Sequence, residues 1–85
     1  MNDYEVSFQF QQGALEWCDS YLFHEKDIKA LSAKVEQLVA QWDLDHKQYD
    51  FECSMQVIFA QDLDNEVDGS PEDITDELPA HVLAD

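Results

Sequence analysis

Residues 4–11, YEVSFQFQ, alternate strictly between large apolar and polar side chains. This period of two, with aromatic or β-branched residues at every second place, predicts a strand that is buried on one face. Gln12-Gly13 follows as the expected turn of a hairpin. Residues 14–23 resume the pattern, but Asp19 stands where an apolar residue is due. We therefore expect a second strand with a β-bulge or a strand end near Asp19.

The pattern changes over residues 25–42, where apolar side chains recur at intervals of three and four. Such a stripe predicts a helix that lays one face on a core, and Glu25 and Asp27 in its first turn favour the helix dipole. Residues 43–46 are expected to be a connecting loop. Residues 49–60 return to alternation, which predicts a third strand. Its inward side chains are expected to be Tyr49, Phe51, Cys53, Met55, Val57 and Phe59.

The predicted order of elements is β-β-α-β. A hairpin followed by a helical crossover lets the third strand pair beside the first. We therefore predict an α+β two-layer sandwich, with a three-stranded antiparallel sheet in the order 2-1-3 and one helix on one face.

The predicted compact α+β domain spans residues 1–60, and residues 61–85 are expected to form an acidic, partly ordered tail. The tail holds nine acids, no lysine and no aromatic residue. Within it, Ser70-Pro71 followed by two acids is typical of a helix start. A short helix that docks through Ile74 and Leu78 is therefore expected.

The charge of the chain is strongly one-sided. Asp and Glu number twenty, while the only basic residues are four lysines, which gives a formal net charge of −16. An acidic surface is repelled by nucleic acid and by anionic lipid, so direct binding to either is not expected. The expected partner is a basic protein, most readily a nucleic-acid-binding enzyme or a nuclease complex.

Three of the lysines, Lys26, Lys29 and Lys34, fall on the helix opposite its apolar stripe, so the sheet side and the tail are expected to be the acidic flank. The competing interpretation is a solvated surface that only maintains solubility. Apolar residues on the outer sheet face (Leu22, Ile58 and Cys18) would suit an interface centre, a homodimer surface or the seat of the C-terminal helix. The predicted partner-binding residues are Glu5, Glu16, Asp50, Glu52, Asp62, Asp64, Glu66, Asp68, Glu72 and Asp73.

Three functions are compatible with these features. The first is a small acidic inhibitor that blocks a basic nucleic-acid-binding surface, and in size and charge the chain resembles DNA mimics and some anti-CRISPR and anti-restriction proteins of phages. The second is an immunity protein or antitoxin that neutralises a cationic nuclease toxin. The third is a non-catalytic adaptor domain whose charge has no role in binding.

Motifs for catalysis or metal binding are weak, so we predict no enzymatic activity, no cofactor and no metal. Residues 64–69, DNEVDG, match the start of an EF-hand loop, but Thr75 stands where the bidentate Glu belongs. The three histidines show no zinc-binding spacing. Cys18 and Cys53 are expected to be reduced.

With no signal peptide or membrane span in the sequence, the expected location is the cytoplasm of a bacterium, or of the host cell if the protein is phage-encoded.

Overall fold

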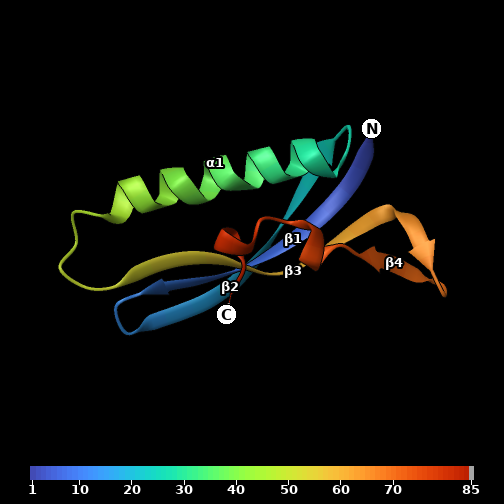
Figure 1. Ribbon diagram of the computed structural model, residues 1–85. Helices are drawn as coiled ribbons and strands as arrows, with labels where there is room; N and C mark the ends of the chain where they lie inside the picture. Colours follow the sequence, from blue (N-terminus) through green and yellow to red (C-terminus); the bar gives the residue numbers. More distant parts are fainter. Residues whose placement is uncertain (85) are drawn as a thin grey trace.

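The computed structural model describes residues 1–84 and consists of a four-stranded antiparallel sheet with one α-helix on one face (Figure 1). The sheet order is β2-β1-β3-β4, so the predicted α+β class and the 2-1-3 order are confirmed, with a fourth strand added beside β3. The elements are β1 Asn2–Gln12, β2 Leu15–Glu25, α1 Ile28–His46, β3 Cys53–Val67, β4 Ser70–Asp73, and the short 3-10 helices η1 Thr75–Glu77 and η2 Ala80–Val82.

The β1–β2 hairpin closes through a two-residue turn at Gly13 and Ala14. Gly13 has φ of +62°, as the first central position of a type II′ turn requires. Its N–H donates to the carbonyl of Glu52 at 2.8 Å, which ties the turn to the segment before β3. The bulge predicted near Asp19 is wrong, because Asp19 pairs with Phe8 in an unbroken register. Its side chain is exposed, so the charge reaches water without any break in the ladder.

Helix α1 begins later and ends later than predicted. Asp27 is its N-cap and accepts a hydrogen bond from the N–H of Ala30 at 2.8 Å, while Glu25 belongs to β2. The loop predicted at residues 43–46 is wrong, because the helix continues to His46. His46 stacks on Trp42 with ring centroids 3.8 Å apart, and its Nδ1 donates to the Trp42 carbonyl at 2.7 Å. These contacts stabilise the last helical turn.

The core lies between the helix and the inner face of β1 and β3. Burying each large apolar side chain contributes roughly 1.5–3 kcal/mol, so this cluster is the main source of stability. The strand β2 contributes the partly buried Phe23, and at the edge of the core Trp17 stacks on Phe10 and Tyr21 lies beside Phe8. The buried members are Tyr4, Val6, Phe8, Phe10, Leu31, Val35, Met55, Val57, Ala60, Ile74, Leu78 and Val82.

A β-bulge in β3 reverses the faces of the residues that follow it. The register with β1 shifts between Ser7 and Phe8 and leaves Ile58 without a partner. Phe59, predicted to point inward, pairs with Ser7 on the outer face, and Ala60 takes the core position. That prediction was wrong because the extra residue changes the alternation.

The start of the third strand also differs from the prediction. β3 begins only at Cys53, so Tyr49 and Phe51 lie in the preceding loop. Their side chains are exposed rather than directed into the core.

Residues 61–84 form part of the same body. β3 continues to Val67, and Asp68 and Gly69, with φ of +54° and +82°, form the turn into β4. Two positive φ values identify a type I′ turn, for which Asp-Gly is a preferred sequence. The helix start predicted at Ser70 is wrong, since Ser70–Asp73 is strand β4. A short 3-10 helix, η1, does follow at Thr75–Glu77, and Ile74 and Leu78 on either side of it are buried as predicted. Asp85, the last residue of the predicted tail, lies outside the described residues.

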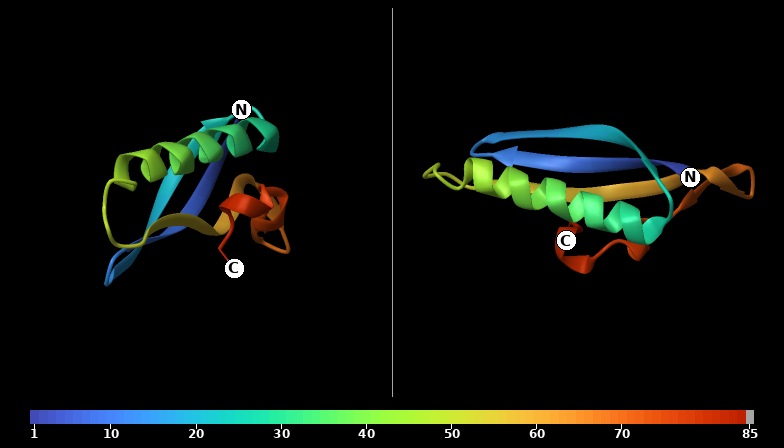
Figure 2. Two further views of the ribbon diagram at one scale, coloured as in Figure 1. Left: turned by 60° about the vertical axis from the view of Figure 1, so that its left-hand side comes forward. Right: turned by 90° about the horizontal axis from the view of Figure 1, so that it is seen from above.

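Beyond β4 the chain returns to the core and lies along β3. Ile74, Leu78 and Val82 are buried. Leu83 forms a parallel bridge with Val57, whose carbonyl accepts from the N–H of Ala84 at 2.8 Å. The C-terminal segment therefore covers part of the β3 edge that β4 leaves open (Figure 2).

Candidate protein-binding surface

The predicted partner-binding residues fall at opposite ends of a molecule that measures 44 × 21 × 19 Å. Asp50 and Glu52, predicted on the outer face of a strand, lie instead in the loop between α1 and β3, and Glu52 adjoins the β1–β2 turn. Glu16 is near the same turn, opposite Gln11. The residues from Asp62 to Asp73 lie at the other end, where the β3–β4 hairpin extends past the start of the helix (Figures 1 and 2).

Glu5 stands apart from both groups on the outer face of β1. It is half-buried, and its carboxylate accepts a hydrogen bond from the side chain of Gln61 at 2.9 Å. Ser7, Gln9 and Gln11 follow it on the same face. Of the acids predicted on the outer sheet face, Glu5 and Glu16 lie there among Ser and Gln, whereas Asp50 and Glu52 do not.

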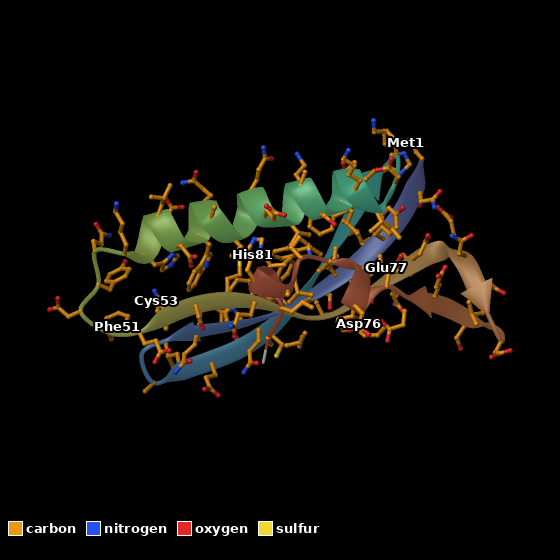
Figure 3. All side chains as sticks on the ribbon, in the orientation of Figure 1. Met1, Phe51, Cys53, Asp76, Glu77 and His81 are labelled. Carbon is orange, nitrogen blue, oxygen red and sulfur yellow. The ribbon has the colours of Figure 1, made fainter. Side chains whose placement is uncertain are left out.

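The densest group of carboxylates, here called the acidic end, surrounds the β3–β4 hairpin. Figure 3 labels Asp76 and Glu77, which lie at the base of the hairpin. All four lysines fall within residues 26–47, whereas ten acids and no lysine occur between residues 48 and 84. The acidic end consists of Asp3, Asp64, Glu66, Asp68, Glu72, Asp73, Asp76 and Glu77.

Asp62, a predicted partner-binding residue, is buried and holds the base of the hairpin. Its side chain is 2% exposed. Oδ2 accepts from the side-chain amides of Asn65 at 2.8 Å and Asn2 at 3.2 Å, and Oδ1 accepts from the N–H of Asp64 at 3.0 Å. A buried carboxylate with its acceptor sites occupied is satisfied internally. Asp62 is therefore a structural residue, and its assignment to the contact surface is corrected.

The network around Asp62 fixes its neighbours. The register between β3 and β4 breaks between Asp62 and Glu66, so residues 63–65 lack strand partners. Asp64 compensates by accepting a hydrogen bond from the N–H of Asp3 at 2.7 Å, which joins the N-terminus to the hairpin. Burial, together with the nearby charge of Asp62, raises the pKa of the Tyr4 phenol above its ordinary value of 10.0.

Asp73 ends β4 with a second small network. The hydroxyl of Thr75 donates to its Oδ1 at 2.7 Å, and the N–H of Thr75 donates to the same oxygen at 2.9 Å. These hydrogen bonds lower the pKa of the Asp73 carboxyl below its ordinary 3.8. The Thr75 hydroxyl also accepts from the N–H of Ala60 at 2.9 Å, which links the acidic end to the core strand.

Aromatic side chains at the opposite end of the molecule were not identified as surface residues from the sequence. Tyr49 and Phe51 stack with ring centroids 5.0 Å apart and are 42% and 47% exposed. Figure 3 shows Phe51 and Cys53 at this end. The sequence did carry a signal of their exposure, because both residues follow the acidic and polar residues at the end of the helix. They border an open hollow of about 370 Å³ lined by Asp43, His46, Lys47, Tyr49, Phe51 and Cys53.

Other chemistry has little support among residues 1–84. No group of three or more His, Cys, Asp or Glu side chains is placed to hold a metal ion in this range. Residues 64–69, which resemble the start of an EF-hand loop, lie in a hairpin rather than between two helices. Cys18 and Cys53 are free thiols. No helix in the described part of the chain is long and apolar enough to span a membrane.

No protein-family model matches this chain, and comparisons with curated proteins and with solved structures gave no match either.

Proposed function

We propose that this protein is a non-enzymatic inhibitor whose acidic end binds the basic nucleic-acid-binding surface of another protein and blocks it. The observation that carries this proposal is the separation of charge. All lysines belong to the helix and its flanks, while the acidic end gathers eight surface carboxylates without a lysine. Among the described residues no lysine forms an ion pair with these carboxylates, and Asp3 alone of the eight has a basic partner in the chain, His24. Cations that neutralise the other seven must therefore come from a partner or from solvent.

The acidic end has the form of a docking element. The hairpin extends past the helix, so a partner can approach its tip and both sides (Figure 1). Leu63 and Val67 are 37% and 53% exposed between the carboxylates of the hairpin. Apolar contact area surrounded by charge is the arrangement found in specific protein interfaces. The internal bonds of Asp62 hold these side chains in place before binding, which reduces the entropic cost of association.

A nucleic-acid-binding protein is the partner that this charge suits best. Its binding groove is lined with Lys and Arg that normally hold phosphates, and duplex DNA presents about one negative charge per 1.7 Å of its axis. A projecting set of carboxylates can occupy such a groove and exclude the nucleic acid. Complementary charge also speeds association and selects cationic partners over others.

The test compares two variants that remove the same number of negative charges. One carries Glu66→Gln, Asp68→Asn, Asp76→Asn and Glu77→Gln in the acidic end. The matched control carries Asp43→Asn, Asp45→Asn, Asp50→Asn and Glu52→Gln at the opposite end. Partners are captured from lysate of the native host, and each purified partner is assayed for displacement of a fluorescent DNA duplex.

We expect the wild-type protein to displace the duplex and its affinity to fall at least about tenfold between low and high salt. The acidic-end variant should bind at least about tenfold more weakly, while the control stays within about twofold of wild type. Affinity that does not change with salt, or equal losses in the two variants, would contradict the proposal.

A further inference from the structure

The two edges of the sheet differ in how far they are covered by other parts of the chain. On the β3 side, β4 pairs with residues 61–67, and the C-terminal segment bonds to Val57. On the other side, β2 pairs only with β1 among the described strands, so its outer edge is open along eleven residues (Figure 2, right). An open edge presents unpaired N–H and C=O groups that can pair with another strand.

β2 has one feature that protects an edge strand, the inward-facing charge of Asp19, but lacks several others. It contains no Pro, Gly or Lys, and its register with β1 has no bulge. Large apolar side chains are exposed on both of its faces. Leu15 and Leu22 are 66% and 73% exposed, and Trp17 and Tyr21 are 37% and 39% exposed.

The hairpin geometry identifies the backbone groups that face outward. Residues flanking a two-residue turn form a hydrogen-bonded pair, which here is Gln12 with Leu15. Because hydrogen-bonded and non-hydrogen-bonded pairs alternate, every second residue of β2 directs its N–H and C=O away from β1. The residues with outward backbone groups are Glu16, Cys18, Ser20, Leu22 and His24.

From this edge we infer that β2 pairs with β2 of a second copy of the chain, antiparallel, with Ser20 on the two-fold axis. This register uses all eleven residues and joins the two sheets into one. On the outer face it sets Cys18 opposite the second copy's Leu22, and Glu16 opposite its His24. On the inner face Trp17 is opposite the second copy's Phe23.

The polar pair in this register is complementary. The Nδ1 of His24 donates to the carboxylate of Asp3 at 2.6 Å, and both side chains are largely exposed. The opposite ring edge of His24 is therefore directed away from Asp3 and can meet the Glu16 carboxylate of the second copy. The pair occurs twice because of the two-fold symmetry.

The two nearest registers with the axis at an outward-facing residue are worse. An axis at Leu22 would set Asp19 opposite Glu25, and like charges directly opposite destabilise a strand pair. An axis at Cys18 would leave the C-terminal part of β2 unpaired. A second copy is thus the occupant that provides matching side chains on both faces of β2 in one register.

The high charge of the chain is compatible with this dimer because of its antiparallel geometry. The acidic end lies near the start of β1 and the end of β2. Reversing the second copy about Ser20 places the two acidic ends at opposite ends of the joined sheet. The inference does not depend on the proposed function, since the two surfaces are separate.

The first test measures the mass of the protein in solution by light scattering and sedimentation equilibrium at physiological salt. We expect twice the 9.9 kDa of one chain. Ser20→Glu should weaken the dimer at least about tenfold, because it sets two carboxylates against each other on the axis. Ser54→Glu makes the same change on the outer face of β3 and should leave the dimer intact.

A monomeric wild-type protein at every concentration would overturn the inference. A dimer that Ser20→Glu does not weaken would overturn it as well, because the contact would then lie elsewhere.

The second test fixes the register by cross-linking and does not require Ser20→Glu to fold. In a Cys18→Ser and Cys53→Ser background, Ser20→Cys should form a covalent dimer with a short bis-maleimide cross-linker. Hydrogen-bonded antiparallel partners have Cα atoms about 5.5 Å apart, which such a linker spans without the closer Cβ approach that a disulfide requires.

The control for the cross-linking is the Cys53→Ser protein, which keeps Cys18. Its two Cys18 residues would be four positions apart along the strands, about 13 Å at roughly 3.3 Å per residue, and should not cross-link. Equal cross-linking of both proteins, or no cross-linking of the Ser20→Cys protein, would exclude this register.

Discussion

The two β-hairpins of this protein contribute differently to its core and to its surface. The β1–β2 hairpin has an unbroken register of eleven pairs, and its strand β1 supplies four buried side chains to the core. The β3–β4 hairpin has a break in register, a four-residue second strand and a tip beyond the core. Its exposed side chains include four carboxylates, those of Asp64, Glu66, Asp68 and Asp73. The comparison shows that stability and surface charge reside in separate parts of a small chain.

The largest expected effect is on the first hairpin. Phe8 is 0% exposed at the centre of the core, so Phe8→Ala should lower the free energy of unfolding by about 3–5 kcal/mol through lost burial and an unfilled cavity. Val67→Ala, in the second hairpin, should change it by less than about 0.5 kcal/mol because Val67 is half exposed. Urea denaturation followed by circular dichroism measures both. Similar losses would show that the second hairpin also carries the core.

An intermediate effect is expected at the base of the second hairpin. Asp62→Ala leaves the amides of Asn2 and Asn65 and the N–H of Asp64 without their acceptor. The expected loss in the free energy of unfolding is about 1–3 kcal/mol, with faster amide hydrogen exchange at residues 63–66. Glu66→Ala is the control, because Glu66 is exposed. A neutral Asp62→Ala would mean that the network does not hold the hairpin.

The smallest effect concerns pH. The folded pKa of Asp73 lies below its ordinary 3.8 because Thr75 donates two hydrogen bonds to it. Its contribution to stability is therefore present above pH 3.8 and is lost as the pH falls through the lowered pKa. In a carbon-13 NMR titration, Thr75→Val should raise the pKa of Asp73 toward 3.8, since the hydroxyl donor is removed. Thr75→Ser keeps a hydroxyl and should keep the pKa low; an identical pKa in all three proteins would show that this hydroxyl is not the cause.

Much of the fold could be predicted from local periodicity. The alternation in residues 4–11 and the stripe in residues 25–42 each reflect a single buried face, and such patterns survive in the sequence whatever the neighbours are. Element ends were predicted less well. The helix extends to His46 because of a stacking contact with Trp42 that no periodicity reveals.

The candidate surface was harder to predict because one β-bulge decides which side chains of β3 face outward. The extra residue Ile58 shifts the alternation of β3, so Asp62 turns inward although strict parity from Met55 places it outside. A bulge has no clear signature in this segment. The turn at Asp68-Gly69 did have one, since Asp-Gly is a strong hairpin signal, but the helix-start pattern at Ser70-Pro71 competed with it. Proline is tolerated in β4 because this strand lies at a sheet edge.

The type I′ turn at Asp68-Gly69 lies at the farthest point of the second hairpin and needs little from the rest of the chain beyond its two positive φ values. Loop tips of this kind accept new residues most readily. The segment could thus be exchanged for another sequence while Asp62 below it keeps the graft anchored. If the acidic end binds a partner as proposed, its specificity could change in this way without any change in the scaffold.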